Sequence, residues 1–294
     1  MNKPAPSAVL ELFKPITWFP PMWAFGCGVV SSGFAPSSRW APAIIGVILA
    51  GPLVCATSQA VNDWYDRHVD AFNEPNRPIP SGRVPGRWGF YIACVWTALS
   101  LAVASTLGQW VLSAAVIGLA LAWAYSAPPL RLKQNGWWGN SAVAICYEGL
   151  PWFTGAAAMA ASLPDWRVIT VALLYSFGAH GIMTLNDFKS IDGDRRTGVL
   201  SVPVQLGVPR AVRLACLVMA APQVVVIALM LIWGRPVQAA IVGALLVTQI
   251  ALMTRLLKSP RERAAWYNAS GTSLYVLGML VSAVALRPSL GGLA

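Results

Sequence analysis

The acidic residues of this 294-residue chain are few, and most of them lie in two short windows. Seven of the eleven Asp and Glu residues fall within 62–74 and 186–196, and each window opens on the pair Asn-Asp. In the first window, Asp63, Asp66 and Asp70 are spaced i, i+3 and i+7, which places them on one face of a helix. Like charges that crowd one face repel each other, and a bound divalent cation would relieve that repulsion.

Carboxylate and amide oxygens are hard ligands, so the two windows indicate Mg²⁺ or Ca²⁺ and not zinc or copper. Mg²⁺ in proteins typically binds one or two carboxylates together with phosphate oxygens of a substrate. Two acidic clusters that face each other among Arg and Lys would therefore suit a diphosphate bridged by Mg²⁺. A solvated acidic loop paired with arginines is the alternative for either window alone. The candidate metal ligands are Asn62, Asp63, Asp66, Asp70, Asp187, Asp192 and Asp194.

The elements that position these residues are membrane spans. Hydrophobic residues make up 56% of the chain and charged residues 11%, whereas a soluble domain carries about 25% charged residues. The apolar residues form long blocks, which excludes a soluble cytosolic enzyme, a disordered chain and a secreted disulfide scaffold. The spans must be helices, because open strands would leave backbone groups unpaired in lipid.

We expect one all-α integral-membrane domain over 1–294, with nine transmembrane helices and a cytoplasmic segment at 1–14. The two Asn-Asp pairs lie at the ends of the second and sixth spans, which indicates two four-helix repeats and one added helix. The predicted spans are 17–35, 42–62, 88–107, 109–126, 138–160, 167–186, 211–233, 236–257 and 265–286.

The basic residues predict the orientation of these spans. Cytoplasmic loops are enriched in Lys and Arg, and 17 of the 21 basic residues fall on one side of the predicted bundle. This places the N-terminus and both acidic windows in the cytoplasm and the C-terminus on the opposite side. The net charge of +10 is then explained by topology and by attraction to anionic lipid headgroups, so it does not require nucleic acid.

The first window reads Asn62-Asp63-x-x-Asp66-x-x-x-Asp70 and resembles the first aspartate motif of the UbiA superfamily of intramembrane prenyltransferases. The second window lies where that family has its second motif, and the resemblance covers nearly the whole chain. Further segments resemble the (bacterio)chlorophyll synthase branch, namely 14–18, 74–82, 125–130, 135–140 and 186–190. Within this branch, 19–23 and 63–68 are most similar to the bacteriochlorophyll enzymes.

The second window departs from the pattern of many family members. They have acids three or four residues after the first Asp of the motif, where this chain has Ser190 and Ile191. The ligands of a second metal therefore cannot be assigned by spacing. Asp194 is the preferred partner for Asp187, and Asp192 is a weaker candidate.

The resemblance implies transfer of a C20 group from geranylgeranyl or phytyl diphosphate to the propionate of bacteriochlorophyllide, with Mg²⁺ as cofactor. It also implies a bacterial inner or intracytoplasmic photosynthetic membrane, and allows for protein neighbours from the pigment pathway. Asp66 and Asp187 would act in catalysis, with Tyr125 as a neutral donor and Lys189 at the acceptor carboxylate or as a counter-ion to Asp187. Candidate diphosphate ligands are Arg67, Arg77, Arg131, Lys133, Lys189, Arg195 and Arg196.

Three residues inside predicted spans are candidates for lining a pigment or lipid cavity. Glu148 is a functional candidate because an intramembrane acid is costly, and the alternative is a neutral Glu bonded to a neighbouring helix. His180 precedes Asp187 by seven residues and should face the same cavity, either as a ligand to the tetrapyrrole magnesium or as a hydrogen-bonded bundle histidine. Trp152 is expected near a membrane interface, in an aromatic belt or stacked on the macrocycle.

Three other functions remain open from sequence alone. A chlorophyll synthase and a quinone-pathway aromatic prenyltransferase would share the fold, and the motif around Lys189 favours a tetrapyrrole acceptor. A cation transporter or channel is disfavoured, because transport sites usually lie near the bilayer midplane and these acids lie at its edge. The choice between geranylgeranyl and phytyl tails is not readable from spacing.

Overall fold

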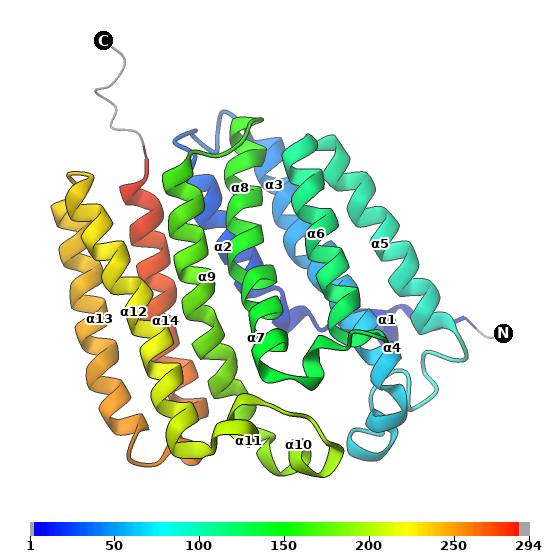
Figure 1. Cartoon of the computed structure of the whole chain (residues 1–294). Helices are drawn as coiled ribbons and strands as arrows, with labels where there is room; N and C mark the ends of the chain where they lie inside the picture. The colour runs from blue at the N-terminus through cyan, green and yellow to red at the C-terminus, as the bar shows by residue number, and fades with distance from the viewer. Residues whose placement is uncertain (1–2, 288–294) are drawn as a thin grey trace.

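The computed structural model describes residues 3–287, and it confirms an all-helical chain. Within these residues, the β structure is limited to one isolated bridge between Asn135 and Leu200. Long helices run side by side, and short helices cover one end of the bundle (Figure 1).

The helices follow one another as an up-and-down bundle with short connections. In chain order they are α1 (Pro6–Leu12), η1 (Pro15–Thr17), α2 (Phe19–Ser31), α3 (Trp40–Ile48), η2 (Leu49–Cys55), α4 (Ala56–Asn73), α5 (Trp88–Thr106), α6 (Gln109–Ser126), η3 (Leu132–Gln134), α7 (Gly136–Ala144), η4 (Ile145–Gly149), α8 (Leu150–Ala160), α9 (Trp166–Asn186), η5 (Asp187–Lys189), α10 (Ile191–Thr197), α11 (Val202–Leu206), α12 (Val208–Ile232), α13 (Pro236–Leu256) and α14 (Pro260–Ala285).

Seven helices of the described chain are long and apolar enough to cross a membrane, so the predicted count of nine is not confirmed. The predicted span 17–35 contains α2, whose 13 residues extend about 20 Å at 1.5 Å per residue and fall short of a 30 Å hydrocarbon core. The predicted span 138–160 corresponds to α7, η4 and α8, where a π-helical segment and the polar Asn140 and Glu148 interrupt the apolar run.

The first acidic window lies within a helix, not at its end. The helix that begins at Trp40 continues past the predicted end at residue 62 and reaches Asn73. Asp63, Asp66 and Asp70 therefore lie on a regular helical face, as their spacing predicted.

Two helices of the bundle contain π-helical segments, and each is associated with a proline. Pro52 lies within η2, and Pro151 is the second residue of α8, which follows η4. Proline has no N–H to donate to the carbonyl four residues before it, so the α-helical hydrogen-bond pattern cannot continue there. At η4 the helix widens into a π-helical segment and then continues into α8.

The basic residues separate between the two ends of the bundle. The four arginines predicted on the outer side make their contacts at the same end of the bundle. Arg235 donates to the Arg287 carbonyl at 3.0 Å, and Arg39 donates to the Met159 carbonyl. Arg167 lies over the Trp233 ring. Figure 1 shows α10 and α11 at the opposite end, together with the loop after α4. The N-terminal α1 also lies toward that end, and α14 finishes at the other end.

Glycines allow α2 and α8 to approach closely. A Cβ on Gly28 would lie 2.1 Å from the Trp152 carbonyl oxygen, and one on Gly155 would lie 2.1 Å from the Phe25 carbonyl oxygen. Such small-residue contacts are how helices pack tightly inside a membrane. They hold α2 against α8. The position of this short helix is therefore set by its packing against α8, and it does not depend on spanning the full membrane.

We expect Gly28→Ala to lower the free energy of unfolding by about 2 kcal/mol, because the new methyl group would collide with backbone. Gly26 of the same helix is the matched control, since a Cβ there meets nothing within 4 Å. Thermal unfolding in detergent measures the difference. Equal midpoints for the two alanine variants would show that α2 and α8 are not in close contact.

Candidate active site

Basic side chains from distant segments neutralise the carboxylates on α4. Lys14 donates to Asp63 Oδ1 at 2.6 Å, and the Arg77 guanidinium lies 3.5 Å from the same oxygen. Arg77 also donates to Asp70 at 2.8 Å and forms an ion pair with Glu74. Asp63 is only 1% exposed, and its second oxygen is buried without a hydrogen-bond partner in the described chain.

Asp66 is held by a second set of partners. It forms an ion pair with Lys133, and an Arg131 nitrogen lies 3.7 Å from it. The Asn62 amide donates to the other Asp66 oxygen at 3.0 Å and to the Ser126 hydroxyl at 3.2 Å. Lys133 belongs to η3, so the loop after α6 folds back over the acidic face of α4.

The electrostatics of the two loop cations differ. The pKa of Lys133 is lowered because burial disfavours its charged form, although the neighbouring Asp66 opposes this effect. Burial also acts against charge on Arg77, but the hydrogen bonds that it donates to Glu74 and the charges of Asp63 and Asp70 together raise its pKa. Arg77 therefore remains cationic, and Asp66 favours the charged form of Lys133.

The second acidic window does not lie on one continuous helix. The α9 helix ends at Asn186, Asp187 begins η5, and Asp194 lies on α10. The Asn140 amide of α7 donates to Asp187 at 2.9 Å, and the Ser190 hydroxyl donates to Asp194 at 2.9 Å.

Tyr125, at the end of α6, lines a cavity together with the first residue of each acidic window, Asn62 and Asn186. The Ser190 hydroxyl donates to the Asp187 carbonyl oxygen at 3.1 Å and to Asp194 at 2.9 Å. The α10 helix therefore brings Asp194 back toward Asp187 although the helix is interrupted.

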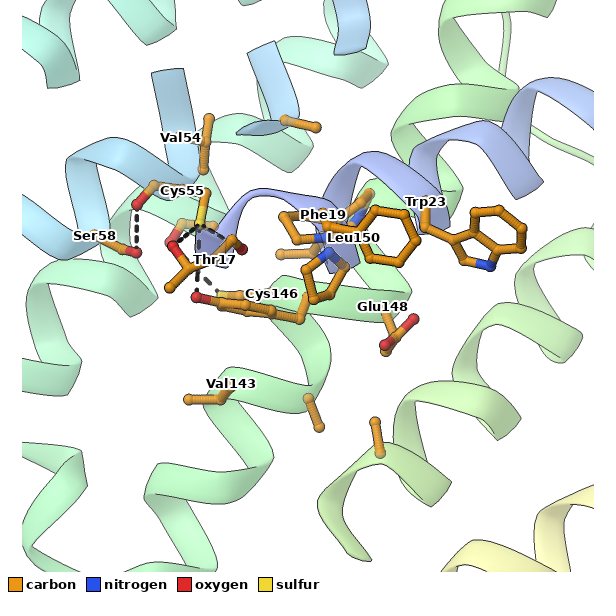
Figure 2. A pocket seen from close by; sticks show the side chains of 18 of the residues that line it. Thr17, Phe19, Trp23, Val54, Cys55, Ser58, Val143, Cys146, Glu148 and Leu150 are labelled. Carbon is orange, nitrogen blue, oxygen red and sulfur yellow. Dashed lines mark hydrogen bonds between the residues drawn. The ribbon is translucent and has the colours of Figure 1, made fainter. Parts of the chain in front are cut away.

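A cavity of about 870 Å³ opens between the helices and connects the two windows. Asn62 and Asn186, the first residues of the two motifs, both line it, and so does Tyr125. Most of its wall is apolar and comes from α2, η2, α6, η4 and α14. Both π-helical segments contribute, through residues such as Cys55 and Glu148 (Figure 2).

Several predicted site residues lie elsewhere. The Arg67 guanidinium stacks on Trp64 at 4.1 Å and donates to the carbonyl of that residue. Asp192 is exposed and reaches Arg261 at 3.5 Å, which removes it from the carboxylates around Tyr125. The exposed basic residues of the second window contact no acid within ion-pair distance in the described chain; they are Lys189, Arg195 and Arg196.

Of the three cavity candidates, Glu148 lines the cavity, and His180 and Trp152 are not among its lining residues. His180 is hydrogen-bonded to the Ser141 hydroxyl at 3.2 Å and stacks on Trp137. Trp152 is fully buried and donates to the Ser31 hydroxyl, so its predicted place at a membrane interface is wrong. It packs in the core because α8 lies against α2.

Sequence reasoning missed three polar residues of the site. Lys14, which counted only toward topology and resemblance, pairs with Asp63. Asn140 holds Asp187, and Asn268 of α14 donates to the Asn186 side-chain Oδ1 at 2.8 Å and lines the cavity. The positive charge directly before the first span was a signal for Lys14, and Asn140 lies in the segment 135–140 that carries the resemblance, whereas Asn268 carries no signal.

Comparison with known proteins decides the family. Residues 18–284 match the UbiA prenyltransferase family. The chain belongs to this family. The match includes both acidic windows and all helices from α2 to α13, so this chain is a prenyltransferase and an enzyme.

Several relatives of this chain are bacteriochlorophyll synthases. The chain is 60% identical to the bacteriochlorophyll synthase 33 kDa chain of Cereibacter sphaeroides, over 97% of this chain and 94% of that protein. It is 39% identical to the chloroplastic chlorophyll synthase of Arabidopsis thaliana, over 94% of this chain and 73% of that protein. The higher sequence identity to the bacteriochlorophyll synthase supports the bacteriochlorophyll branch over the chlorophyll branch. The family match also disfavours an aromatic prenyltransferase of another branch and a transporter.

Solved structures share the family fold. A UbiA homolog from Archaeoglobus fulgidus bound to DMAPP and Mg²⁺ superposes with a TM-score of 0.74, at 20% identity, over 94% of this chain and 99% of that one. A structure concerned with digeranylgeranylglyceryl phosphate synthase gives a TM-score of 0.76 at 20% identity, over 96% of this chain and 98% of that one.

We expect Lys14→Met to lower the free energy of unfolding by about 1–2 kcal/mol, because buried Asp63 would lose its closest cation. Adding Asp63→Asn should restore most of this loss, since the unpaired charge is then removed. Thermal unfolding in detergent measures both variants, with the exposed Lys3→Met as control. A double variant no more stable than Lys14→Met would show that the pair is not coupled.

Proposed function

We propose that the chain esterifies the propionate of bacteriochlorophyllide with a geranylgeranyl or phytyl group taken from its diphosphate. The observation that carries this proposal is the shared cavity, which meets the first residue of each acidic motif at its polar end and is mostly apolar elsewhere. A prenyl diphosphate has the same division into a charged head and a hydrocarbon tail. The 60% identity to a bacteriochlorophyll synthase supports the pigment as acceptor.

The residues present fit Mg²⁺ held jointly with a diphosphate. No group of three acids, cysteines or histidines within residues 3–287 lies close enough to hold a metal alone, so phosphate oxygens must complete the coordination. The unpartnered Asp63 oxygen and the Asp66 carboxylate are the donors on α4. Asp187 and Asp194 are the donors of the second window. Mg²⁺ bound there would supply a Lewis acid that stabilises the departing diphosphate.

The chain's own cations have a related task. Lys14, Arg77 and Lys133 already pair with the carboxylates of α4, and they can turn to phosphate oxygens when a diphosphate enters. Tyr125 provides a neutral donor between the two windows. Arg131 lies 3.7 Å from Asp66 and is a further candidate for the diphosphate, and the exposed Arg195 and Arg196 are candidates beside the second window.

The acceptor requires positioning and not activation. A propionate is ionised at neutral pH, so it can attack the allylic carbon without a general base. Lys189 is exposed and lies at the end of η5, two residues after Asp187, so it is available to bind the propionate carboxylate. The apolar cavity keeps water away from the cation-like carbon as the bond to diphosphate breaks.

The location follows from the same arrangement. The end of the bundle that carries the acidic windows also carries most of the basic residues, which supports a cytoplasmic location for it by the positive-inside rule. The protein would lie in the inner or intracytoplasmic photosynthetic membrane, with α14 ending on the opposite side. Neighbouring proteins of the pigment pathway remain a prediction.

Membranes that contain the protein should esterify bacteriochlorophyllide when geranylgeranyl diphosphate and Mg²⁺ are supplied. The product should disappear with EDTA and fall at least about 100-fold in Asp66→Ala, because both remove stabilisation of the leaving group. Chromatography of the pigments measures the ester. The exposed His68→Gln on the same helix is the control. Diphosphate cleavage without an ester, when either bacteriochlorophyllide or chlorophyllide is supplied, would contradict the proposed acceptor.

Substitutions of two of the three acids in the second window should lower the esterification rate to different extents. We expect Asp187→Asn to lower the esterification rate about 100-fold, whereas Asp192→Asn should retain at least half of it, since Asp192 faces Arg261 at the surface. Initial rates at saturating substrates separate the two cases. A larger loss in Asp192→Asn than in Asp187→Asn would reverse the assignment.

A further inference from the structure

Glu148 is a buried acid that the esterification does not use. Its side chain is 7% exposed and lines the cavity, and its Oε2 atom has no hydrogen-bond partner in the described chain. Figure 2 shows its carboxyl group among the lining side chains. It lies in the π-helical segment η4, and such segments occur frequently at functional sites.

The surroundings of Glu148 favour its neutral form, in which its carboxyl group can donate a hydrogen bond. Among residues 3–287, no Lys, Arg or His forms an ion pair with it. Apolar lining residues such as Trp23, Leu150 and Pro151 share the cavity with it. An unpaired charge there would cost several kcal/mol, so the neutral acid is the stable form. The neutral acid carries one O–H group, which needs an acceptor on whatever fills the cavity.

Only one of the two substrates can provide that acceptor at this depth. The prenyl tail is a hydrocarbon and has no polar atom. Glu148 lies eight residues along the helix from Asn140, the partner of Asp187, which corresponds to about 12 Å. A pigment whose propionate lies beside the diphosphate and whose macrocycle extends into the cavity would bring a substituent on its far edge to Glu148. In bacteriochlorophyllide a, an acetyl group lies on that side, and chlorophyllide a has a vinyl group in its place.

We propose that Glu148 donates a hydrogen bond to the acetyl carbonyl of bacteriochlorophyllide a and thereby selects it over chlorophyllide a. This inference rests on the proposed function and deepens it. A site built to bond a polar group discriminates strongly against an analogue that lacks the group, because its own polar atom is then left unpaired.

Kinetics with both pigments test this role. We expect Glu148→Leu to lower kcat/KM about tenfold for bacteriochlorophyllide a and to change it less than twofold for chlorophyllide a. Glu148→Gln keeps a donor of similar size and should retain most of the preference. Thr154→Val is the matched control, because the Thr154 hydroxyl lines the same cavity but is satisfied by the Leu150 carbonyl at 2.6 Å.

A measurement without turnover separates selection from a structural effect. Resonance Raman spectra of bacteriochlorophyllide a bound to the protein, without prenyl diphosphate, should show the acetyl stretch at lower frequency than in Glu148→Leu. An unshifted acetyl band in the wild-type complex, or equal losses for both pigments in Glu148→Leu, would overturn the inference. Absence of ester from the wild-type protein would instead contradict the proposed function, so the two failures are distinguishable.

Discussion

The fold depends on the neutralisation of carboxylates that are withdrawn from water at one end of a membrane bundle. Asp63 is almost fully buried, and an unpaired charge in that position would cost several kcal/mol. Lys14 and Arg77 neutralise Asp63, and Lys133 pairs with Asp66 on the same helix. The pairs hold the N-terminal segment, the loop after α4 and the loop after α6 around one helix face. The same cations are then available for the diphosphate.

The second feature is a cavity that the helices leave open. Glycine contacts bring α2 tightly against α8, whereas the prolines near η2 and η4 interrupt regular helix geometry along the cavity wall. Polar groups gather where Asn62 and Asn186 face each other, and the apolar remainder suits a hydrocarbon tail. Chemistry at the mouth and exclusion of water inside therefore arise from one packing arrangement.

The sequence predicts this architecture well where the signal is local. Hydropathy identifies the long helices, and the i, i+3, i+7 spacing identifies the acidic face of α4. Contacts between residues far apart in the sequence could not be predicted, because no local pattern shows that Lys14 reaches Asp63 or that Asn140 reaches Asp187. Trp152 was misplaced because hydropathy cannot tell a lipid-facing tryptophan from one buried between helices. The count of nine spans assumed uniform length, which the short α2 does not have.

We propose that metal and diphosphate bind together at α4 and displace the cations from its carboxylates. Electron paramagnetic resonance of Mn²⁺, used in place of Mg²⁺, measures this directly on the purified protein, with protein-free diphosphate as reference. The account predicts Mn²⁺ binding that is at least about tenfold tighter with geranylgeranyl diphosphate than without it, and loss of this gain in Asp66→Ala. Equal Mn²⁺ affinity with and without the diphosphate, or unchanged binding in Asp66→Ala, would contradict it.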